Sequence, residues 1–268
     1  MKPNSILFWL LLSVANFGFS QNTTPRDKTN IDSDWRFAFG HPYDTAKDFG
    51  HAEAYFSYLA KTGSADGPAA TVFDDRAWRL LNLPHDWAVE QPFSDKASYS
   101  HGFHVAGKGF PERSVGWYRK QVSIAKEDLG RIITLKFDAV FRNAKVWFNG
   151  HFLGTEESGY DSFEYDVTAY VKYGEQNTIA VRVDASMEEG WWYEGAGIYR
   201  HVYLQKTSPL HIATNGTYVT TQIKNADADV NIVATLLNQG NYKGQATLRH
   251  TMYSLSLIHI SEPTSRTP

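Results

Sequence analysis

The fold of this chain is constrained most by a succession of short segments in which large apolar side chains alternate with polar ones. Alternation at period two is typical of a strand with one buried face. Turn residues separate these segments, and little of the chain has helical periodicity. Short strands at this spacing predict an antiparallel sandwich, and a jelly roll accommodates this many of them. The predicted strands are residues 35–39, 79–84, 116–124, 131–137, 143–148, 151–154, 177–183 and 199–204.

The dipeptide Asn149-Gly150 lies between two of these strands. Asparagine and glycine both tolerate the left-handed backbone that a two-residue hairpin turn requires, so the pair is the strongest short-range hairpin signal. We therefore assign the segment from Asn143 to Gly154 to structure and not to function.

Pro209 marks the end of the first domain, which we place at residues 34–207. Strand-like segments resume after it, at residues 210–212, 217–223, 229–237 and 244–253. They are expected to open an immunoglobulin-like sandwich over residues 208–253. Such a domain needs about 100 residues, so we expect it to be incomplete.

Both ends of the chain are expected to lie outside these domains. Residues 1–20 have the pattern of a secretory signal peptide, with one lysine, an apolar core and a small residue before the cleavage site. This predicts a secreted or periplasmic bacterial protein. Residues 21–33 are polar and are predicted to be a linker. Residues 254–268 include the run LSLIHISEPT, which resembles the translation of a transposon-type sequencing adapter, so we expect them to be foreign and to interrupt a longer chain.

Composition excludes several classes of function. The net charge is −3 and no basic stripe is present, so neither nucleic acid nor an anionic membrane surface is expected as a partner. Without cysteine, the chain forms no disulfide, thiolate nucleophile or cysteine-ligated metal site. The histidines have no metal-ligand spacing, and neither a phosphate-binding loop nor a Gly-x-Ser-x-Gly motif occurs. The apolar core of the leader is too short to span a bilayer comfortably, so no membrane span is expected.

The first candidate site is Leu83-Pro-His-Asp-Trp87, a loop that follows a predicted strand. His85, Asp86 and Trp87 place an imidazole, a carboxylate and an indole together, a set that can bind sugar hydroxyls and stack on a sugar ring. Alternatively, Asp86 caps a turn and Trp87 fills the edge of the core, which is the commoner use of such residues.

The second candidate is Trp191-Trp-Tyr-Glu-Gly-Ala-Gly-Ile-Tyr-Arg200. Its three adjacent aromatics cannot all face one core from a regular strand, because side chains alternate, so some must lie on a loop or rim. The two glycines allow tight bends, and Arg200 is a fixed cation that could hold a carboxylate. The segment is either a structural corner or a loop that projects toward a ligand shared with another domain.

Two further features carry less information. Residues 91–114 are the least periodic stretch, and long loops within compact domains are often functional. The acidic pairs Asp74-Asp75 and Glu188-Glu189 are expected on solvated faces or turns. Two catalytic carboxylates need a defined separation across a cleft, which adjacency in sequence does not supply.

Taken in order, five segments resemble glycoside hydrolase family two, which contains β-galactosidases, β-glucuronidases and β-mannosidases. They are Leu83-Pro-His-Asp-Trp87, Val115-Gly-Trp-Tyr-Arg119, Val146-Trp-Phe-Asn-Gly-His-Phe-Leu-Gly154, Asp161-Ser-Phe-Glu-Tyr-Asp-Val-Thr168 and Trp192-Tyr-Glu-Gly-Ala-Gly-Ile-Tyr-Arg200. The resemblance begins near Asp34, weakens after Leu204 and looks most like the β-galactosidase-type members of the Bacteroidetes.

The resemblance implies a jelly-roll sugar-binding domain, an immunoglobulin-like domain and then a (β/α)8 barrel with two catalytic glutamates and a retaining mechanism. In the family, loops of the first domain help to shape the sugar pocket on the barrel. The implied sugar contacts or pocket supports are His85, Asp86, Trp87, Trp192, Tyr193 and Glu194. No catalytic residue, cofactor or metal is expected in this part of the enzyme. The implied substrate is a galactoside-like β-glycoside, and the full-length enzyme is a candidate homo-oligomer.

Two functions of other classes stay open. A stand-alone carbohydrate-binding module would suit the fold, although the second domain after Pro209 argues against it. A purely structural domain would instead make Trp192 matter for assembly and stability. The face that packs on a barrel in the family would then be exposed apolar surface, which favours aggregation.

Overall fold

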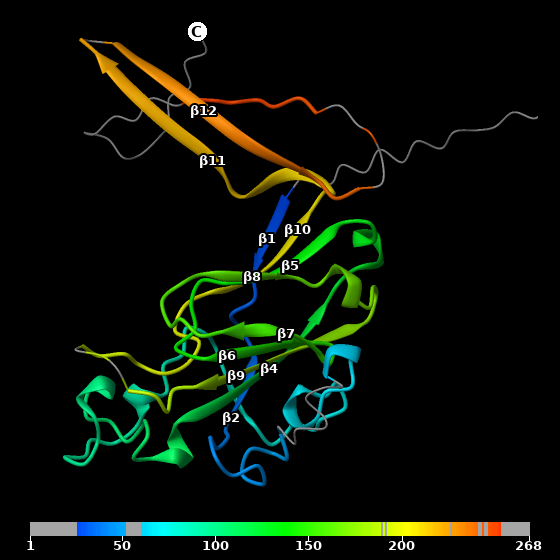
Figure 1. The fold of residues 1–268 in the computed structure, drawn as a ribbon. Helices are drawn as coiled ribbons and strands as arrows, with labels where there is room; N and C mark the ends of the chain where they lie inside the picture. The colour runs from blue at the N-terminus through cyan, green and yellow to red at the C-terminus, as the bar shows by residue number, and fades with distance from the viewer. Residues whose placement is uncertain are drawn as a thin grey trace, which may run out of the picture.

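The computed structural model describes residues 26–51, 60–188, 190, 192–225, 227–240, 243 and 246–252. The predicted leader and the predicted foreign tail therefore lie outside the described residues. Within the described part the protein is all-β, as predicted, with a sandwich below a projecting hairpin (Figure 1). Its helices are single 3₁₀ turns, and none in that part has the length and apolar character needed to cross a membrane.

Two antiparallel sheets build the sandwich from the described residues. One sheet has the order β3-β2-β4-β9-β6-β7, and the other has the order β1-β10-β5-β8. The strands of the first are Arg79–Leu81 (β3), Trp35–Phe39 (β2), Val115–Ser123 (β4), Gln176–Asp184 (β9), Ala144–Phe148 (β6) and His151–Glu156 (β7). The strands of the second are Arg26–Asn30 (β1), Val202–Thr207 (β10), Ile132–Phe137 (β5) and Phe163–Asp166 (β8).

The main core lies between the two sheets. In β5, Ile133, Leu135 and Phe137 are completely buried, while the residues between them are half-buried. This is the period-two alternation that the sequence shows. Each such buried apolar side chain contributes about 1.5–3 kcal/mol, which is why the register of these strands is firmly set.

A second core covers the outer face of the six-stranded sheet. Trp117 of β4 and Trp147 of β6 stack there with ring centroids 5.5 Å apart, and the segment between β2 and β3 covers them. Because both faces of the sheet are covered, β9 is buried continuously from Asn177 to Val183. The 3₁₀ turns η1 (Ala60–Thr62) and η2 (Gly67–Ala69) belong to this covering segment.

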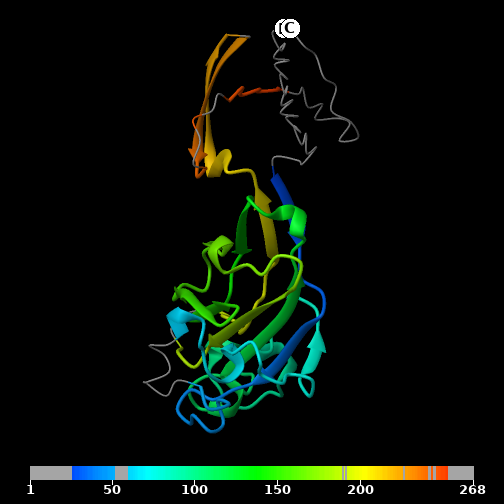
Figure 2. The ribbon, with the colours of Figure 1, turned by 90° about the vertical axis from the view of Figure 1, so that its right-hand side faces the viewer.

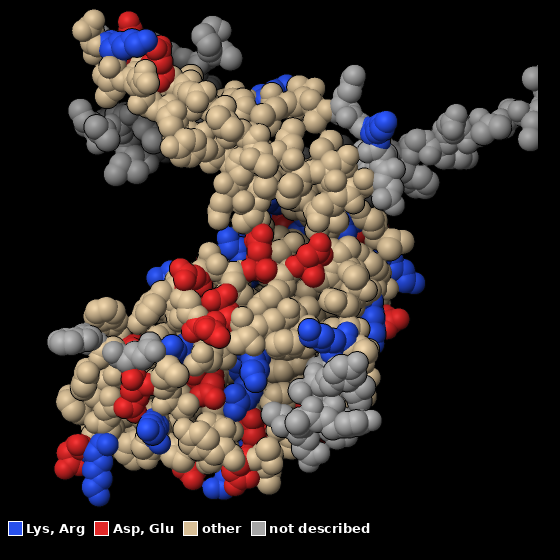
Figure 3. Space-filling model, in the orientation of Figure 1, with Lys and Arg blue, Asp and Glu red and all other residues tan. Residues whose placement is uncertain are grey.

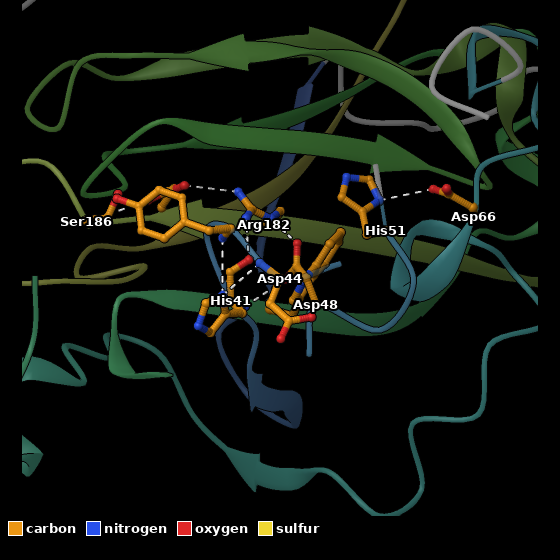
Figure 4. Close-up of polar contacts among 10 residues, drawn as sticks. His41, Asp44, Asp48, His51, Asp66, Arg182 and Ser186 are labelled. Carbon is orange, nitrogen blue, oxygen red and sulfur yellow. Dashed lines mark hydrogen bonds and ion pairs between the residues drawn. The ribbon is translucent and has the colours of Figure 1, made fainter. Parts of the chain in front are cut away.

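A buried polar network holds the covering segment on the sheet (Figure 4). Asp48 Oδ2 accepts a hydrogen bond from Arg182 Nε at 2.8 Å, and Asp48 Oδ1 accepts one from Trp117 Nε1 at 2.8 Å. The backbone N–H of His41 also donates to Asp48 Oδ1 at 3.1 Å. Next to this network, His51 Nδ1 lies 3.1 Å from Asp66 Oδ1. His41 and His51 are thus structural residues.

The hairpin consists of β11 (Leu210–Lys224) and β12 (Asp227–Asn238), with an irregularity between Ile212 and Thr217. It projects away from the sandwich, as the view turned by 90° also shows (Figure 2). The predicted strands in this region are confirmed up to residue 238. Residues 246–252 form no strand, although one was expected there. The immunoglobulin-like character of this region stays a prediction.

The sequence missed two strands and placed the start of a third too early. Strand β1 lies within the segment that was predicted to be a linker. Its residues are polar and mostly exposed, so the sequence shows no buried face there, and backbone pairing with β10 holds the strand in the sheet. Strand β10 begins at Val202, three residues later than expected, and the short strand β8 was not foreseen. The remaining 3₁₀ turns are Ala88–Glu90 (η3), Tyr99–His101 (η4), Pro111–Arg113 (η5), Lys126–Asp128 (η6) and Thr168–Tyr170 (η7).

Candidate functional site

The two candidate segments found in the sequence lie against each other in the structure. The backbone N–H of His85 donates to Ile198 O at 2.8 Å, and that of Trp87 donates to Ala196 O at 2.9 Å. These two bonds pair the loop after β3 with the loop before β10, although more than a hundred residues separate them. Side chains at the loop tips are therefore held at fixed positions relative to each other.

Asp86 is the polar centre of this arrangement. Its Oδ1 accepts hydrogen bonds from the backbone N–H groups of Ala196 (2.8 Å) and Ala88 (3.0 Å). Its Oδ2 accepts a hydrogen bond of 2.5 Å from the Tyr193 hydroxyl. The Ala88 bond is the turn cap expected from the sequence, while the other two join Asp86 to the second loop. Asp86 is thus both a cap and a cross-link.

Gly195 lets the second loop approach Asp86. Its φ is +70°, and a Cβ at this position would lie 2.7 Å from Asp86 Oδ2. The left-handed backbone and the close contact both require glycine here.

His85 lies below the loop and supports it. Its ring is 6% exposed, with Nδ1 2.7 Å from the Tyr118 hydroxyl and Nε2 3.4 Å from Glu90 Oε1. Burial lowers the pKa of His85, and the nearby Glu90 carboxylate opposes this shift only in part. A neutral imidazole in this position braces the loop from within and does not face solvent.

Trp87 is completely buried in the main core. Its Nε1 donates to Arg113 O at 2.8 Å, and its ring packs 5.8 Å from that of Phe37 and 6.1 Å from that of Phe39. Of the two roles predicted for Trp87, sugar contact or pocket support, the geometry is that of a support. Contact with a ligand stays untested.

Trp192 and Tyr193 form the exposed rim of the site. Their side chains are 63% and 43% exposed. Trp192 Nε1 donates to the Tyr160 hydroxyl at 3.1 Å, which fixes an otherwise free indole. Burial and the neighbouring Asp86 carboxylate raise the pKa of Tyr193, so its hydroxyl stays a donor. Trp191 lies outside the described residues.

Glu194 points inward beside this rim. It is 9% exposed, and its backbone N–H donates to Ser100 O at 2.7 Å. The carboxylate packs against Gly190, where a Cβ would lie 2.6 Å from Glu194 Oε1. Glu194 therefore fastens the rim to η4. Arg200, a predicted carboxylate holder, is exposed and has no ion pair with a described residue, and its guanidinium lies 5.5 Å from the centroid of the Tyr199 ring.

Sequence reasoning missed the part that His101 plays. The ring is completely buried, with Nδ1 3.1 Å from Gly195 O and Nε2 3.2 Å from Ala185 O. It ties the end of β9 and the rim loop to the irregular segment 91–114. The carbonyl partners lie 84 and 94 residues away, so no local spacing marks this histidine. Its place in the long irregular loop was the one available signal.

An open hollow of about 550 Å³ lies on segment 91–114. Lys96, Lys108, Phe110 and Glu188 line it, and the backbone N–H of Lys108 donates to Glu188 Oε1 at 2.9 Å. No three histidine, aspartate or glutamate side chains in the described part of the chain lie together as a metal site would require.

Comparison with known proteins places this geometry in a family. The model of the sugar-binding domain of glycosyl hydrolases family 2 matches residues 66–208, more than half of the chain. The β-galactosidase BoGH2A of Bacteroides ovatus is 37% identical over 92% of the chain and 26% of its own length. A β-glucuronidase of Formosa agariphila is 32% identical over 62% of the chain and 19% of its own length.

Solved structures agree with this assignment. A family 2 glycosyl hydrolase from Bacteroides cellulosilyticus superposes with a TM-score of 0.65 and 35% identity, covering 79% of this chain and 24% of that one. A β-glycosidase from Bacteroides vulgatus gives a TM-score of 0.63 at 30% identity, covering 81% and 25%. The chain thus spans about a quarter of the length of these relatives. The matched region contains β3 to β10 and both candidate loops, and the chain belongs to glycosyl hydrolases family 2 through its sugar-binding domain.

Proposed function

We propose that the chain is the N-terminal part of a secreted, retaining β-glycosidase of the β-galactosidase type. Its sandwich would form one wall of a sugar pocket completed by a catalytic barrel. The family match supports this role, and the two relatives named above carry glycosidase names. The predicted leader supports secretion, which analysis of the N-terminus of the exported protein would test.

One observation carries the proposed wall. Asp86 is held by two backbone N–H groups and by the Tyr193 hydroxyl, directly beside the exposed rings of Tyr193 and Trp192. A carboxylate accepts hydrogen bonds from sugar hydroxyls, and an aromatic face packs on the apolar face of a pyranose. His85, Trp87 and Glu194 hold this pair in place from the buried side. Such a rigid supporting layer is what a binding site needs.

The acidic pairs of the sequence do not have the arrangement of a glycosidase pair. Asp74 is bonded to Arg76 and Asp75 to Arg119. Glu188 accepts from the backbone of Lys108, and Glu189 lies outside the described residues. We therefore assign the proposed catalytic glutamates to the barrel and predict that this chain alone is inactive. Assay of the purified chain on nitrophenyl glycosides tests this, and clear turnover would contradict it.

A galactoside is proposed over a glucuronide because of the charge at the rim. A glucuronide brings its own carboxylate, which would meet that of Asp86. The relatives carry both substrate names, so the choice depends on this local argument.

The wall is tested in a chimaera in which residues 26–208 replace the corresponding domain of the Bacteroides ovatus β-galactosidase. If the chimaera is active, Asp86→Asn is expected to lower kcat/KM on nitrophenyl galactoside by about 10–100-fold, because a positioning contact is lost. The matched control is Asp95→Asn, an exposed aspartate that has no hydrogen bond with a described residue. An unchanged kcat/KM for Asp86→Asn would contradict a pocket role.

A stand-alone carbohydrate-binding module is the second candidate, favoured by the exposed Trp192. Titration of the chain with methyl galactoside separates the two functions. A module would bind methyl galactoside, and Trp192→Ala would abolish that binding. One wall of a pocket would bind the sugar only weakly. A purely structural role would instead leave binding at Trp192 undetectable and make Trp192→Ala change assembly.

A further inference from the structure

A groove separates the four-stranded sheet of the sandwich from the hairpin above it. Its volume is about 200 Å³, and an adjoining hollow of about 260 Å³ shares Glu164 and Thr214 with it. Figure 3 shows acidic side chains gathered on the sandwich near the narrow waist below the hairpin. The residues that line the groove are Arg26, Ile132, Thr134, Glu164, Asp166, Gln205, Thr207, His211, Thr214, Leu237 and Gln239.

The floor of the groove follows from the register of the sheet. Val202 and Leu204 of β10 belong to the main core. Alternation therefore turns Gln205 and Thr207 to the outer face. Their cross-strand partners on β5 are Thr134 and Ile132, which line the groove with them.

Gln205 is the unusual residue of this floor. It is only 6% exposed, and its side-chain amide makes no hydrogen bond with a described residue. The adjacent Thr207 is 5% exposed, and its hydroxyl likewise has no hydrogen bond with that part of the chain. The side-chain polar atoms of both residues reach the groove, since none of them is a fully buried, unpaired atom. Two polar groups that line one groove without a partner in the described part of the chain can therefore pair with the hydroxyls of a polar ligand.

Several neighbouring groups are already engaged within the chain. Asp166 accepts hydrogen bonds from the backbone and hydroxyl of Thr168, Arg26 donates to Ile212 O, and His211 Nδ1 lies 2.8 Å from Ser208 O. Glu164 is exposed and has no ion pair with a described residue. The groups that can receive a ligand are therefore the amide of Gln205, the hydroxyl of Thr207 and the carboxylate of Glu164.

We propose that this groove binds one ring of a neutral sugar, at a site separate from the rim around Asp86. Sugar hydroxyls both donate and accept, so they match an amide, a hydroxyl and a carboxylate together. Ile132 and Leu237 offer apolar contact for the ring carbons. A volume of about 200 Å³ is below the usual range for drug-sized ligands and suits a single ring. Glu164 and Asp166 would repel an acidic sugar.

The groove and the rim lie at opposite ends of β10. The rim loop precedes Val202, and the groove lies at the Thr207 end of the same strand. Six residues of strand span about 20 Å, so one sugar ring cannot occupy both sites. The proposal therefore goes beyond the pocket wall proposed above and does not depend on it.

The experiment is a titration of the ¹⁵N-labelled full chain with D-galactose, followed by NMR up to about 100 mM, far above a millimolar Kd. The expected result is a saturable shift of the Gln205 side-chain amide and of the Thr134 and Thr207 backbone amides. Gln205→Leu is expected to weaken this binding at least tenfold. That substitution removes an amide that makes no hydrogen bond with a described residue, so the fold should tolerate it.

A matched variant and a second probe control the result. Gln222→Leu, on an exposed part of the hairpin, is expected to leave the galactose affinity unchanged. D-glucuronate is expected to bind at least tenfold more weakly than galactose. Glu164→Gln removes one negative charge from the groove and should therefore reduce this difference in affinity between the two sugars.

Three outcomes would overturn the proposal. Absence of a saturable shift at Gln205 shows that the amide is satisfied by water alone. Shifts confined to Trp192 and Tyr193 place the sugar at the rim and support the pocket wall instead. An unchanged galactose affinity in Gln205→Leu shows that this residue is no part of a sugar site.

Discussion

The hydroxyl of Tyr193 donates a 2.5 Å hydrogen bond to Asp86 Oδ2 across 107 residues of sequence. Both residues come from the segments that the sequence marked as candidate sites, and the bond joins the tips of the two loops. It places one exposed aromatic ring beside a carboxylate that is fixed by backbone N–H groups. The same bond therefore contributes to the stability of the sandwich and to the shape of the proposed pocket wall.

Replacement of Asp86 is expected to destabilise the domain more than replacement of Tyr193. Asp86→Ala removes three acceptor interactions, and hydrogen bonds to a charged group contribute about 1.5–3 kcal/mol before solvent screening of this part-exposed site. We expect a loss of about 2–3 kcal/mol for Asp86→Ala and about 1 kcal/mol for Tyr193→Phe. Urea unfolding followed by circular dichroism measures both. Asp95→Ala is the control, since this exposed aspartate has no hydrogen bond with a described residue. Equal losses for Asp86→Ala and Asp95→Ala would refute the cross-link.

Gly116 is expected to tolerate no side chain. A Cβ there would lie 2.5 Å from Cζ3 of Trp87 and 2.8 Å from Cε2 of Phe37, both in the closely packed core. Overpacking of this kind costs about 1–3 kcal/mol, so Gly116→Ala should lower the unfolding free energy by at least that amount. Gly109→Ala is the matched control, because a Cβ there meets nothing within 4 Å. Differential scanning calorimetry measures the Tm of both variants. Equal Tm values would disprove the prediction.

The sequence predicted those strands and turns that a short local pattern marks. Alternation in β5 gave its buried face, with Ile133, Leu135 and Phe137 completely buried. The Asn149-Gly150 turn has φ values of 49° and 79°, as a two-residue hairpin turn requires. Strand β1 escaped prediction because it is polar and exposed, and its pairing with β10 joins segments that lie far apart in the sequence.

The candidate site was predicted as a set of residues and not as an arrangement. The sequence grouped His85, Asp86 and Trp87, but it could not show that Asp86 alone reaches the rim while His85 and Trp87 face inward. Side-chain direction on an irregular loop depends on tertiary hydrogen bonds, such as that from Ala196 N to Asp86 Oδ1. Periodicity carries no information about such bonds.

Asp48 and Arg182 form a buried ion pair whose disruption is expected to be costly. Their side chains are 5% and 9% exposed, and the Asp48 carboxylate also accepts from Trp117. Loss of one partner leaves a buried charge, so Asp48→Ala is expected to lower the unfolding free energy by about 3–5 kcal/mol. Asp229→Ala is the control, because the Lys224–Asp229 pair is 65% and 67% exposed and should contribute less than about 1 kcal/mol. Chemical denaturation that finds similar losses in the two variants would exclude a structural role for the network.

His51 is expected to make the stability of the domain depend on pH. Burial, together with the positive charges of Arg182 and Lys145, lowers its pKa to about 3, so the 3.1 Å contact with Asp66 joins a neutral imidazole to a carboxylate. The unfolded chain binds a proton below about pH 6.5, whereas the folded chain does not until about pH 3.

The stabilising contribution of neutral His51 is therefore fully present above about pH 6.5 and decreases as the pH falls toward 3, by at most about 1.4 kcal/mol per pH unit. His51→Gln keeps a donor for Asp66 and does not titrate. The unfolding free energies of the wild-type chain and of this variant are measured from pH 7 to pH 5. The wild-type chain should lose more stability than the variant over this interval, so a variant that is less stable at pH 7 should approach the wild-type value at pH 5. Parallel curves over that interval would show that the pKa of His51 is the same in the folded and unfolded states.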